Sequence, residues 1–253
     1  MRFASLGSGS RGNATLVSSG QTCILIDCGF SAREIERRMQ AIEFDIRTLT
    51  AIIVTHEHAD HIGGVRVLAR KYQLPVYTTV GTAASLAEDV QSLVNPINAH
   101  TSFVIQDIEV CPFPVPHDAR EPCQFIFTNG RHRLGLLTDA GESTPMIEEM
   151  LSHCDALLLE ANHDSEMLEN GDYPAHLKQR VAGRLGHLNN TQSCALLERI
   201  DTSRLQHIIA MHLSEKNNSP DIVAPLFAKV LNCEQAWIGL ASQRTGFDWR
   251  ELN

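Results

Sequence analysis

Long apolar runs, aromatic residues and paired cysteines are all scarce in this chain, and each scarcity excludes a class of protein. No stretch approaches the roughly 20 apolar residues of a membrane-spanning helix, and the first residues lack the apolar segment of a secretory signal. Aromatic residues make up only 6% of the chain, which argues against base stacking as the main mode of binding. The seven cysteines include no C-x-x-C pair, so we expect a reducing, cytoplasmic setting without a disulfide framework.

Basic residues are also few. The chain has 21 Lys and Arg against 30 Asp and Glu, a formal charge of −9. This balance excludes a wholly basic coat for nucleic acid but leaves a local basic patch open. The sequence contains no G-x-S-x-G elbow and no glycine-rich loop ending in Lys-Ser/Thr. We therefore expect neither a serine nucleophile nor a P-loop.

What the chain does have is an alternation of short apolar strands and amphipathic helices. We predict strands at 3–6, 14–17, 23–26, 51–54, 75–78, 103–105, 108–112, 124–128, 132–137, 156–159, 208–211 and 236–240, the last followed by a short tail. We predict helices at 31–41, 63–72, 145–151, 175–185, 191–200 and 220–231. Without a linker or repeat, residues 1–253 should form one layered α/β domain with two similar halves.

Histidine is enriched, with 12 residues, and the densest cluster directly follows the predicted strand 51–54. Residues two apart on an extended segment point the same way, so His56 and His58 can share one ion. Asp60 and His61 come next and can face a second ion nearby. Imidazole and carboxylate ligands suit Zn, Mn or Fe. So many polar groups at the end of a buried strand predict a metal site rather than packing.

Four further polar residues follow apolar runs elsewhere in the chain, namely Asp27, His117, Asp139 and His212. A single residue of this kind is usually a cap or a turn residue. Together with the histidine cluster, however, they supply the ligands that two metal ions need.

The order His56-x-His58-x-Asp60-His61, followed by His117, Asp139 and His212, resembles the metallo-β-lactamase-fold hydrolase superfamily. The resemblance extends from Asp27 to His212. It implies a four-layer αββα sandwich with the metals at the edge of the sheets.

The same resemblance implies a ligand set. One metal ion would be bound by His56, His58 and His117. The other would be bound by Asp60, His61 and His212. Asp139 would bridge the two ions, and Asp27 would orient the ligand loop through hydrogen bonds. An aspartate in place of a cysteine ligand points to a dinuclear hydrolase rather than to an antibiotic-degrading lactamase.

Narrower motifs resemble the YycJ/WalJ branch, which is associated with exonuclease action on DNA. These motifs are Leu6-Gly-Ser-Gly-Ser-Arg-Gly-Asn-Ala-Thr15, Glu160-Ala-Asn-His-Asp164, Gly171-Asp-Tyr-Pro174, Leu177-Lys-Gln-Arg180 and Gly186-His-Leu-Asn-Asn190. Phosphoribosyl cyclic phosphodiesterases and tRNA 3′-processing nucleases share parts of the pattern. The resemblance implies hydrolysis of phosphodiesters.

Two divalent ions about 3.5–4 Å apart can hold a hydroxide that attacks phosphorus, and they neutralise the charge that develops. We assign Asp60, His187 and His163 to the catalytic set. The two histidines remain after metal ligation. Each could bind a phosphate oxygen or protonate the leaving alkoxide, or could simply cap a helix or loop.

Two segments could contact phosphate. The loop 7–13 could cradle a phosphate through Ser8, Gly9, Ser10 and Asn13, or could be a plain β-turn. Lys178, Arg180 and Arg184 could meet a phosphate backbone, or could form a solvated helix face.

The sequence therefore predicts a cytoplasmic, dinuclear metal-dependent phosphodiesterase, a DNA exonuclease of the YycJ/WalJ kind. A cyclic or nucleotide phosphodiester fits the net charge more easily and stays open as substrate. A thioester or lactone hydrolase and a regulatory metal-binding protein without turnover are further alternatives. Three imidazoles favour Zn, and the oxygen-richer second group favours Mn. We expect no membrane partner and leave a homodimer open.

Overall fold

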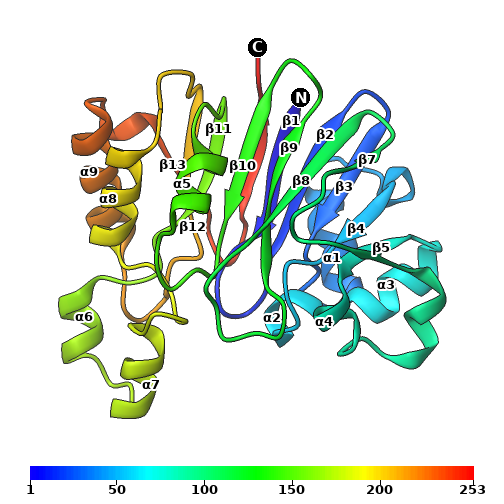
Figure 1. Cartoon of the computed structure of the whole chain (residues 1–253), viewed down its shortest axis with the longest axis horizontal. Helices are drawn as coiled ribbons and strands as arrows, with labels where there is room; N and C mark the ends of the chain where they lie inside the picture. The colour runs from blue at the N-terminus through cyan, green and yellow to red at the C-terminus, as the bar shows by residue number, and fades with distance from the viewer.

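Two seven-stranded sheets face each other between outer layers of helices in the computed structural model, which describes residues 1–253 (Figure 1). The strand order is β14-β1-β2-β3-β4-β5-β6 in the first sheet and β13-β12-β11-β10-β9-β8-β7 in the second. The strands are β1 Arg2–Gly7, β2 Ala14–Ser19, β3 Thr22–Ile26, β4 Ala51–Ile53, β5 Val76–Thr79, β6 Val94–Ile97, β7 Phe103–Ile105, β8 Ile108–Pro114, β9 Cys123–Thr128, β10 Arg133–Leu137, β11 Ala156–Glu160, β12 His207–Met211, β13 Ile238–Leu240 and β14 Phe247–Glu251.

The α-helices are α1 Ala32–Ala41, α2 Ala59–Ile62, α3 Val65–Tyr72, α4 Val80–Ala83, α5 Pro145–Leu151, α6 Ser165–Asn170, α7 Ala175–Val181, α8 Asn190–Arg199 and α9 Pro220–Leu231. Short 3₁₀ turns, η1 to η3, occupy Ile46–Thr48, Glu88–Leu93 and Gln235–Trp237. None of the helices combines the length and the apolar character that crossing a membrane requires. All seven cysteines are free thiols.

Three separate apolar clusters give the molecule its four layers. On β3, Ile24 and Ile26 pack between the two sheets, whereas Leu25 packs outward under α1 and α3. On β11, Leu158 faces the other sheet and Leu157 faces outward, into the cluster that includes α5, α8 and α9. The runs Ile24–Ile26 of β3 and Ala156–Leu159 of β11 are continuously apolar because both faces of these strands are buried. The predicted αββα sandwich is confirmed.

The parallel strands position the site. Strands β3 to β6 run parallel in the first sheet, and strands β10 to β13 run parallel in the second. Parallel strands bring their carboxyl ends to the same edge of a sheet, where ligands of α/β proteins commonly bind. In this chain the polar residues that follow β3, β4, β10, β11 and β12 contact one another across the two sheets.

Two expectations about the chain's local structure were wrong. The residues predicted as a tail form β14, which pairs antiparallel with β1 through Phe3 and Arg250. The alternation of Phe247 and Trp249 with charged residues is the period of a half-buried strand. The helix predicted over 175–185 ends at Val181, where the chain turns back and the His187 N–H donates to the Val181 carbonyl at 2.9 Å. This turn brings His187 towards the sheet edge.

Candidate metal centre and active site

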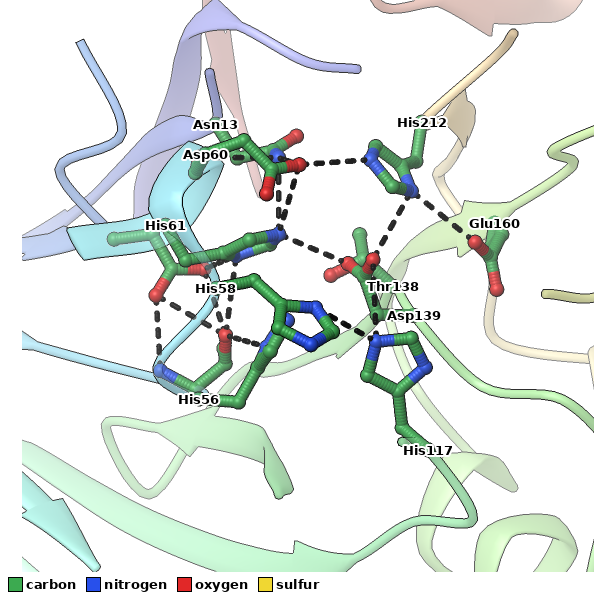
Figure 2. Close-up of polar contacts among 12 residues, drawn as sticks. Asn13, His56, His58, Asp60, His61, His117, Thr138, Asp139, Glu160 and His212 are labelled. Atoms are coloured by element: carbon green, nitrogen blue, oxygen red, sulfur yellow. Dashed lines mark hydrogen bonds and ion pairs between the residues drawn. The ribbon is translucent and has the colours of Figure 1, made fainter. Parts of the chain in front are cut away.

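The candidate site is built from residues at the carboxyl ends of strands (Figure 2). His56 and His58 lie between β4 and α2, and Asp60 and His61 begin α2. Asp139 follows β10, and His212 follows β12. The backbone of Asp27, Asp139 and His212 adopts the left-handed conformation, with φ of 58°, 53° and 53°. This conformation is uncommon outside glycine and turns each side chain sharply at the end of its strand.

A close backbone contact holds the start of α2 against the loop after β3. A Cβ atom placed on Gly29 would lie 1.7 Å from the Asp60 carbonyl oxygen, so only glycine fits there. The same carbonyl accepts a hydrogen bond from the Asn13 N–H at 2.8 Å. The ligand-bearing turn is therefore fixed by main-chain packing.

The predicted ligands converge in two groups. His56, His58 and His117 each offer a nitrogen, and the three nitrogens lie within 4.8 Å of one another. A second group within the same limit is formed by Asp60, His61 and His212.

Asp139 connects the two groups. One of its carboxylate oxygens lies 3.3 Å from His61 Nε2, and the other lies 3.4 Å from His212 Nδ1 and 3.9 Å from His117 Nε2 (Figure 2). The carboxylate is therefore placed where it could contact two ions, one in each group.

Hydrogen bonds behind the histidines fix which nitrogen faces the centre. Asp27 Oδ2 lies 2.7 Å from His61 Nδ1, and Asp27 Oδ1 accepts from the Thr55 N–H at 2.9 Å. His117 Nδ1 lies 3.0 Å from the Gly186 carbonyl oxygen, which can only accept. Donation from Nδ1 in both rings leaves the Nε2 lone pair directed at the cluster, as metal ligation requires.

Three buried polar atoms of the cluster have no hydrogen-bond partner, namely His56 Nε2, Asp139 Oδ2 and His212 Nε2. Leaving a buried polar atom unpaired costs about 1–3 kcal/mol, so such atoms are rare in folded proteins. All three belong to the predicted ligand set. Divalent cations coordinated in the two groups would satisfy all three atoms, so the donor set fits a metal centre.

Two of the buried groups already have the charge that a metal ligand needs. Burial lowers the pKa of His56 well below its ordinary value, and the neighbouring His61 lowers it further. Burial alone would raise the pKa of Asp139, but His212 and His61 outweigh burial and hold it well below the usual range. A neutral imidazole and an ionised carboxylate are the forms in which these side chains bind metals. His61 and His212 do not have the required charge: burial would lower their pKa, but Asp139 and neighbouring carboxylates outweigh burial and raise it, so both rings must lose a proton when metal binds.

Glu160 is a site residue that the sequence reasoning missed. It ends β11 with a fully buried side chain, and its Oε1 lies 2.8 Å from His187 Nδ1 and 3.2 Å from His212 Nδ1. Burial would raise the pKa of Glu160, but His187 and His212 lower it to about 2. Glu160 follows the apolar run 156–159 in the same manner as Asp139, and this pattern was the available signal.

A cavity of about 340 Å³ opens beside the cluster. Of the two histidines predicted as candidate general acids, His187 and His163, only His187 lines this cavity. His163 is buried and lines a separate cavity of about 280 Å³ between α6 and α7, where burial lowers its pKa to about 4. The structure therefore brings His187, but not His163, to the metal-binding cluster.

The predicted phosphate contacts are also divided. In the loop 7–13 the N–H groups of Ser8, Gly9 and Asn13 are hydrogen-bonded within the protein, as are those of residues 11 and 12. Ser10 alone keeps an unbonded N–H, and it lines the cavity. The Asn13 side-chain amide lies 3.0 Å from His61 Nε2, on the side of that ring that faces the cluster.

Three basic side chains were predicted to contact phosphate. Of these, Arg180 lines the cavity and pairs with Asp118. Lys178 lies on the separate cavity and donates to the Glu169 carbonyl. Arg184 pairs with Glu142 on the surface, and 84% of its side chain is exposed.

Comparison with known proteins decides the family. A model of the beta-lactamase superfamily domain matches residues 22–212. The chain belongs to this superfamily. Exodeoxyribonuclease YycJ of Bacillus anthracis is 34% identical to the chain over 249 residues. The match covers 95% of the chain and 93% of YycJ. Exodeoxyribonuclease WalJ of Streptococcus pneumoniae serotype 2 is 32% identical over 229 residues, covering 87% and 84%.

The fold of the chain is similar to that of solved structures. The metallo-β-lactamase fold protein YhfI of Bacillus subtilis superimposes with a TM-score of 0.74 at 16% identity, covering 99% of both chains. The resemblance predicted from the motifs, both to the superfamily and to its YycJ/WalJ branch, is confirmed.

Proposed function

We propose that this metal-dependent hydrolase is an exodeoxyribonuclease that releases nucleotides from DNA ends. The observation that carries the proposal is the cavity in which His187 faces the ligand cluster, with Glu160 hydrogen-bonded behind it. The likeness to YycJ and WalJ, both named exodeoxyribonucleases, supports DNA as the substrate because it extends over most of their lengths. The free cysteines are consistent with a cytoplasmic location.

We further propose that the centre holds two divalent ions, Zn or Mn. His56, His58 and His117 would bind one, and Asp60, His61 and His212 would bind the other. Asp139 would contact both ions, and Asp27 would orient His61. When bound, two such ions activate water as the nucleophile and neutralise charge on the phosphodiester.

In this proposal, His187 supplies the proton that the leaving group needs. Glu160 accepts a hydrogen bond from His187 Nδ1, so a buried carboxylate orients the ring. His187 Nε2 would donate a proton to the leaving alkoxide, which departs as an alcohol. Arg180, on the wall of the same cavity, can exchange its pairing with Asp118 for a phosphate oxygen.

A small cyclic phosphodiester remains the second candidate substrate. The cavity is at the small end of the range for ligand sites, and the formal charge of −9 repels a long polyanion. In both reactions the same cluster would bind the phosphodiester.

The test compares substrates on one purified preparation supplied with Mn²⁺ or Zn²⁺. 5′-Phosphorylated duplex DNA, a cyclic phosphoribosyl ester and bis(p-nitrophenyl) phosphate are incubated in parallel, with Asp139→Asn as the control for contaminating nuclease. We expect mononucleotides from DNA with the wild type and none with the variant. Turnover of the cyclic ester alone would favour the small substrate, and inactivity on all three would contradict phosphodiester hydrolysis.

A further inference from the structure

The cavity at the metal-binding cluster has two unlike halves. One half is the polar cluster itself, including His58, Asp60 and His187. The other half comes from α7 and the turn before it, which extend beyond the strand ends (Figure 1). This second half supplies the flat and apolar surface of the cavity, through Tyr173, Leu177 and Val181.

Helix α7 presents this surface in a regular manner. Leu177 and Val181 are four residues apart, so they share one face of the helix. Tyr173 stands just ahead of the helix, before Pro174. Ala59 is the only other apolar residue among the cavity's sixteen lining residues. The apolar surface of the cavity is therefore concentrated on one wall, whereas the predicted metal ligands form a polar wall.

A positive charge lies over one face of the Tyr173 ring, which leaves the other face for a stacked base. Lys216 Nζ lies 5.5 Å from the centroid of the Tyr173 ring. Arg180 and Arg11 near the same cavity are paired with Asp118 and Glu215, whereas Lys216 has no carboxylate within ion-pair distance. Lys216 is exposed and thus available to an anion that arrives over the ring.

A nucleotide matches the two halves of the cavity, because it has an anionic phosphate at one end and a flat base at the other. We propose that Tyr173 is the stacking platform for the base of the terminal nucleotide, and that Lys216 contacts the adjoining phosphate. This inference rests on the proposed exonuclease function. Every base has a face that can stack, so one ring gives binding without sequence preference. The low aromatic content of the chain is compatible with this role because one base needs only one ring.

The size of the cavity adds a consequence for the substrate. About 340 Å³ suits a single nucleotide and not a base pair. We therefore expect the terminal nucleotide of a duplex to unpair before it enters, and an end that is already single-stranded to be the better substrate.

The experiment measures the first cleavage of two oligonucleotides that differ only in the terminal nucleotide, which carries its base or is abasic. We expect Tyr173→Ala to lower kcat/KM on the normal end roughly ten- to a hundredfold, while changing the abasic end less than about twofold. Tyr173→Phe should retain wild-type preference, because the ring remains. Trp237→Ala, on the surface and outside the cavity, should change neither substrate. Equal losses on both ends, or no loss on either, would overturn the assignment.

A second measurement separates this inference from the proposed function. A terminal 5-iododeoxyuridine is photo-crosslinked to the EDTA-treated wild-type chain, and the attachment site is mapped by mass spectrometry. We expect attachment at Tyr173. Crosslinking elsewhere would overturn the inference. If Tyr173 is labelled while the metal-loaded chain leaves DNA uncut, the stacking site stands and the exonuclease proposal fails.

Discussion

His58 Nδ1 and His117 Nε2 face each other at 3.3 Å. Each ring donates from its other nitrogen to a backbone carbonyl, His58 to Asp118 at 3.2 Å and His117 to Gly186 at 3.0 Å. Carbonyl oxygens only accept, so the two lone pairs are left pointing at one another. Two facing lone pairs repel unless a cation lies between them. A metal ion bound by both nitrogens would occupy this position, so we expect metal binding to stabilise the ligand cluster.

Removing and restoring metal should therefore change stability. Addition of Zn²⁺ or Mn²⁺ to the EDTA-treated chain at a thousandfold excess over Kd should stabilise it by about 4 kcal/mol. For a chain of this size the corresponding rise in Tm is roughly 10 °C, measurable by differential scanning fluorimetry. His117→Ala should reduce the rise, and the exposed His153→Ala should leave it intact. Elemental analysis should find two ions per chain; a value of one would contradict the paired centre.

The two candidate acids should behave differently. His187→Ala should lower kcat on DNA by about 10²- to 10⁴-fold, because the leaving group loses its proton donor. His163→Ala removes a histidine that the main cavity does not contain, so its kcat should stay within a few-fold of wild type. Metal content, measured on both variants, should match wild type. Wild-type turnover by His187→Ala would remove this residue from the mechanism.

The two arginines near the cavity form a second matched pair. Arg180→Ala should raise KM for DNA several-fold and reduce the salt dependence of binding by about one phosphate contact. Arg184→Ala should leave both quantities unchanged, since its side chain pairs with Glu142 at the surface. Binding titrations at several salt concentrations supply the measurement. Identical slopes for the two variants would show that Arg180 does not contact the substrate backbone.

Gly29→Ala should destabilise the fold because the new Cβ meets the Asp60 carbonyl oxygen. The main chain on both sides must shift, which we expect to lower the free energy of unfolding by about 3 kcal/mol. Gly130→Ala is the control, with φ of 82° but no atom within 4 Å, and should cost only about 1 kcal/mol of backbone strain. Urea denaturation compares the two. A Gly29→Ala variant as stable as Gly130→Ala would mean that the loop accommodates the methyl group freely.

The sandwich and the two ligand groups could be predicted because their signals are local. Each predicted ligand directly follows an apolar run or lies within one short motif, and the family resemblance assigned the groups. The short tail was predicted wrongly because pairing of Phe247–Glu251 with β1 depends on a contact between opposite ends of the chain. Single-strand periodicity is weak over five residues, so such pairing is hard to recognise in one sequence.

Glu160 shows a different limit. Its place after a strand resembled that of Asp139, yet no spacing rule indicated that it would meet His187, which is 27 residues later. Equally, Lys178, Arg180 and Arg184 look alike in sequence. Their separate environments follow from the end of α7 at Val181 and the turn that follows it. Such turns decide which basic side chain reaches the cavity. The positions at which helices end cannot be read from one sequence accurately enough to predict this.

The left-handed backbone at Asp27, Asp139 and His212 sets folding and chemistry against each other. Side chains other than glycine carry about 1–3 kcal/mol of strain in this conformation, and here three such residues adjoin the same centre. Glycine would adopt these backbone angles without strain, but it would remove the Asp27 hydrogen bonds to Thr55 and His61 and two of the predicted ligands. The backbone strain at these three positions is therefore kept because the site needs side chains that glycine cannot provide.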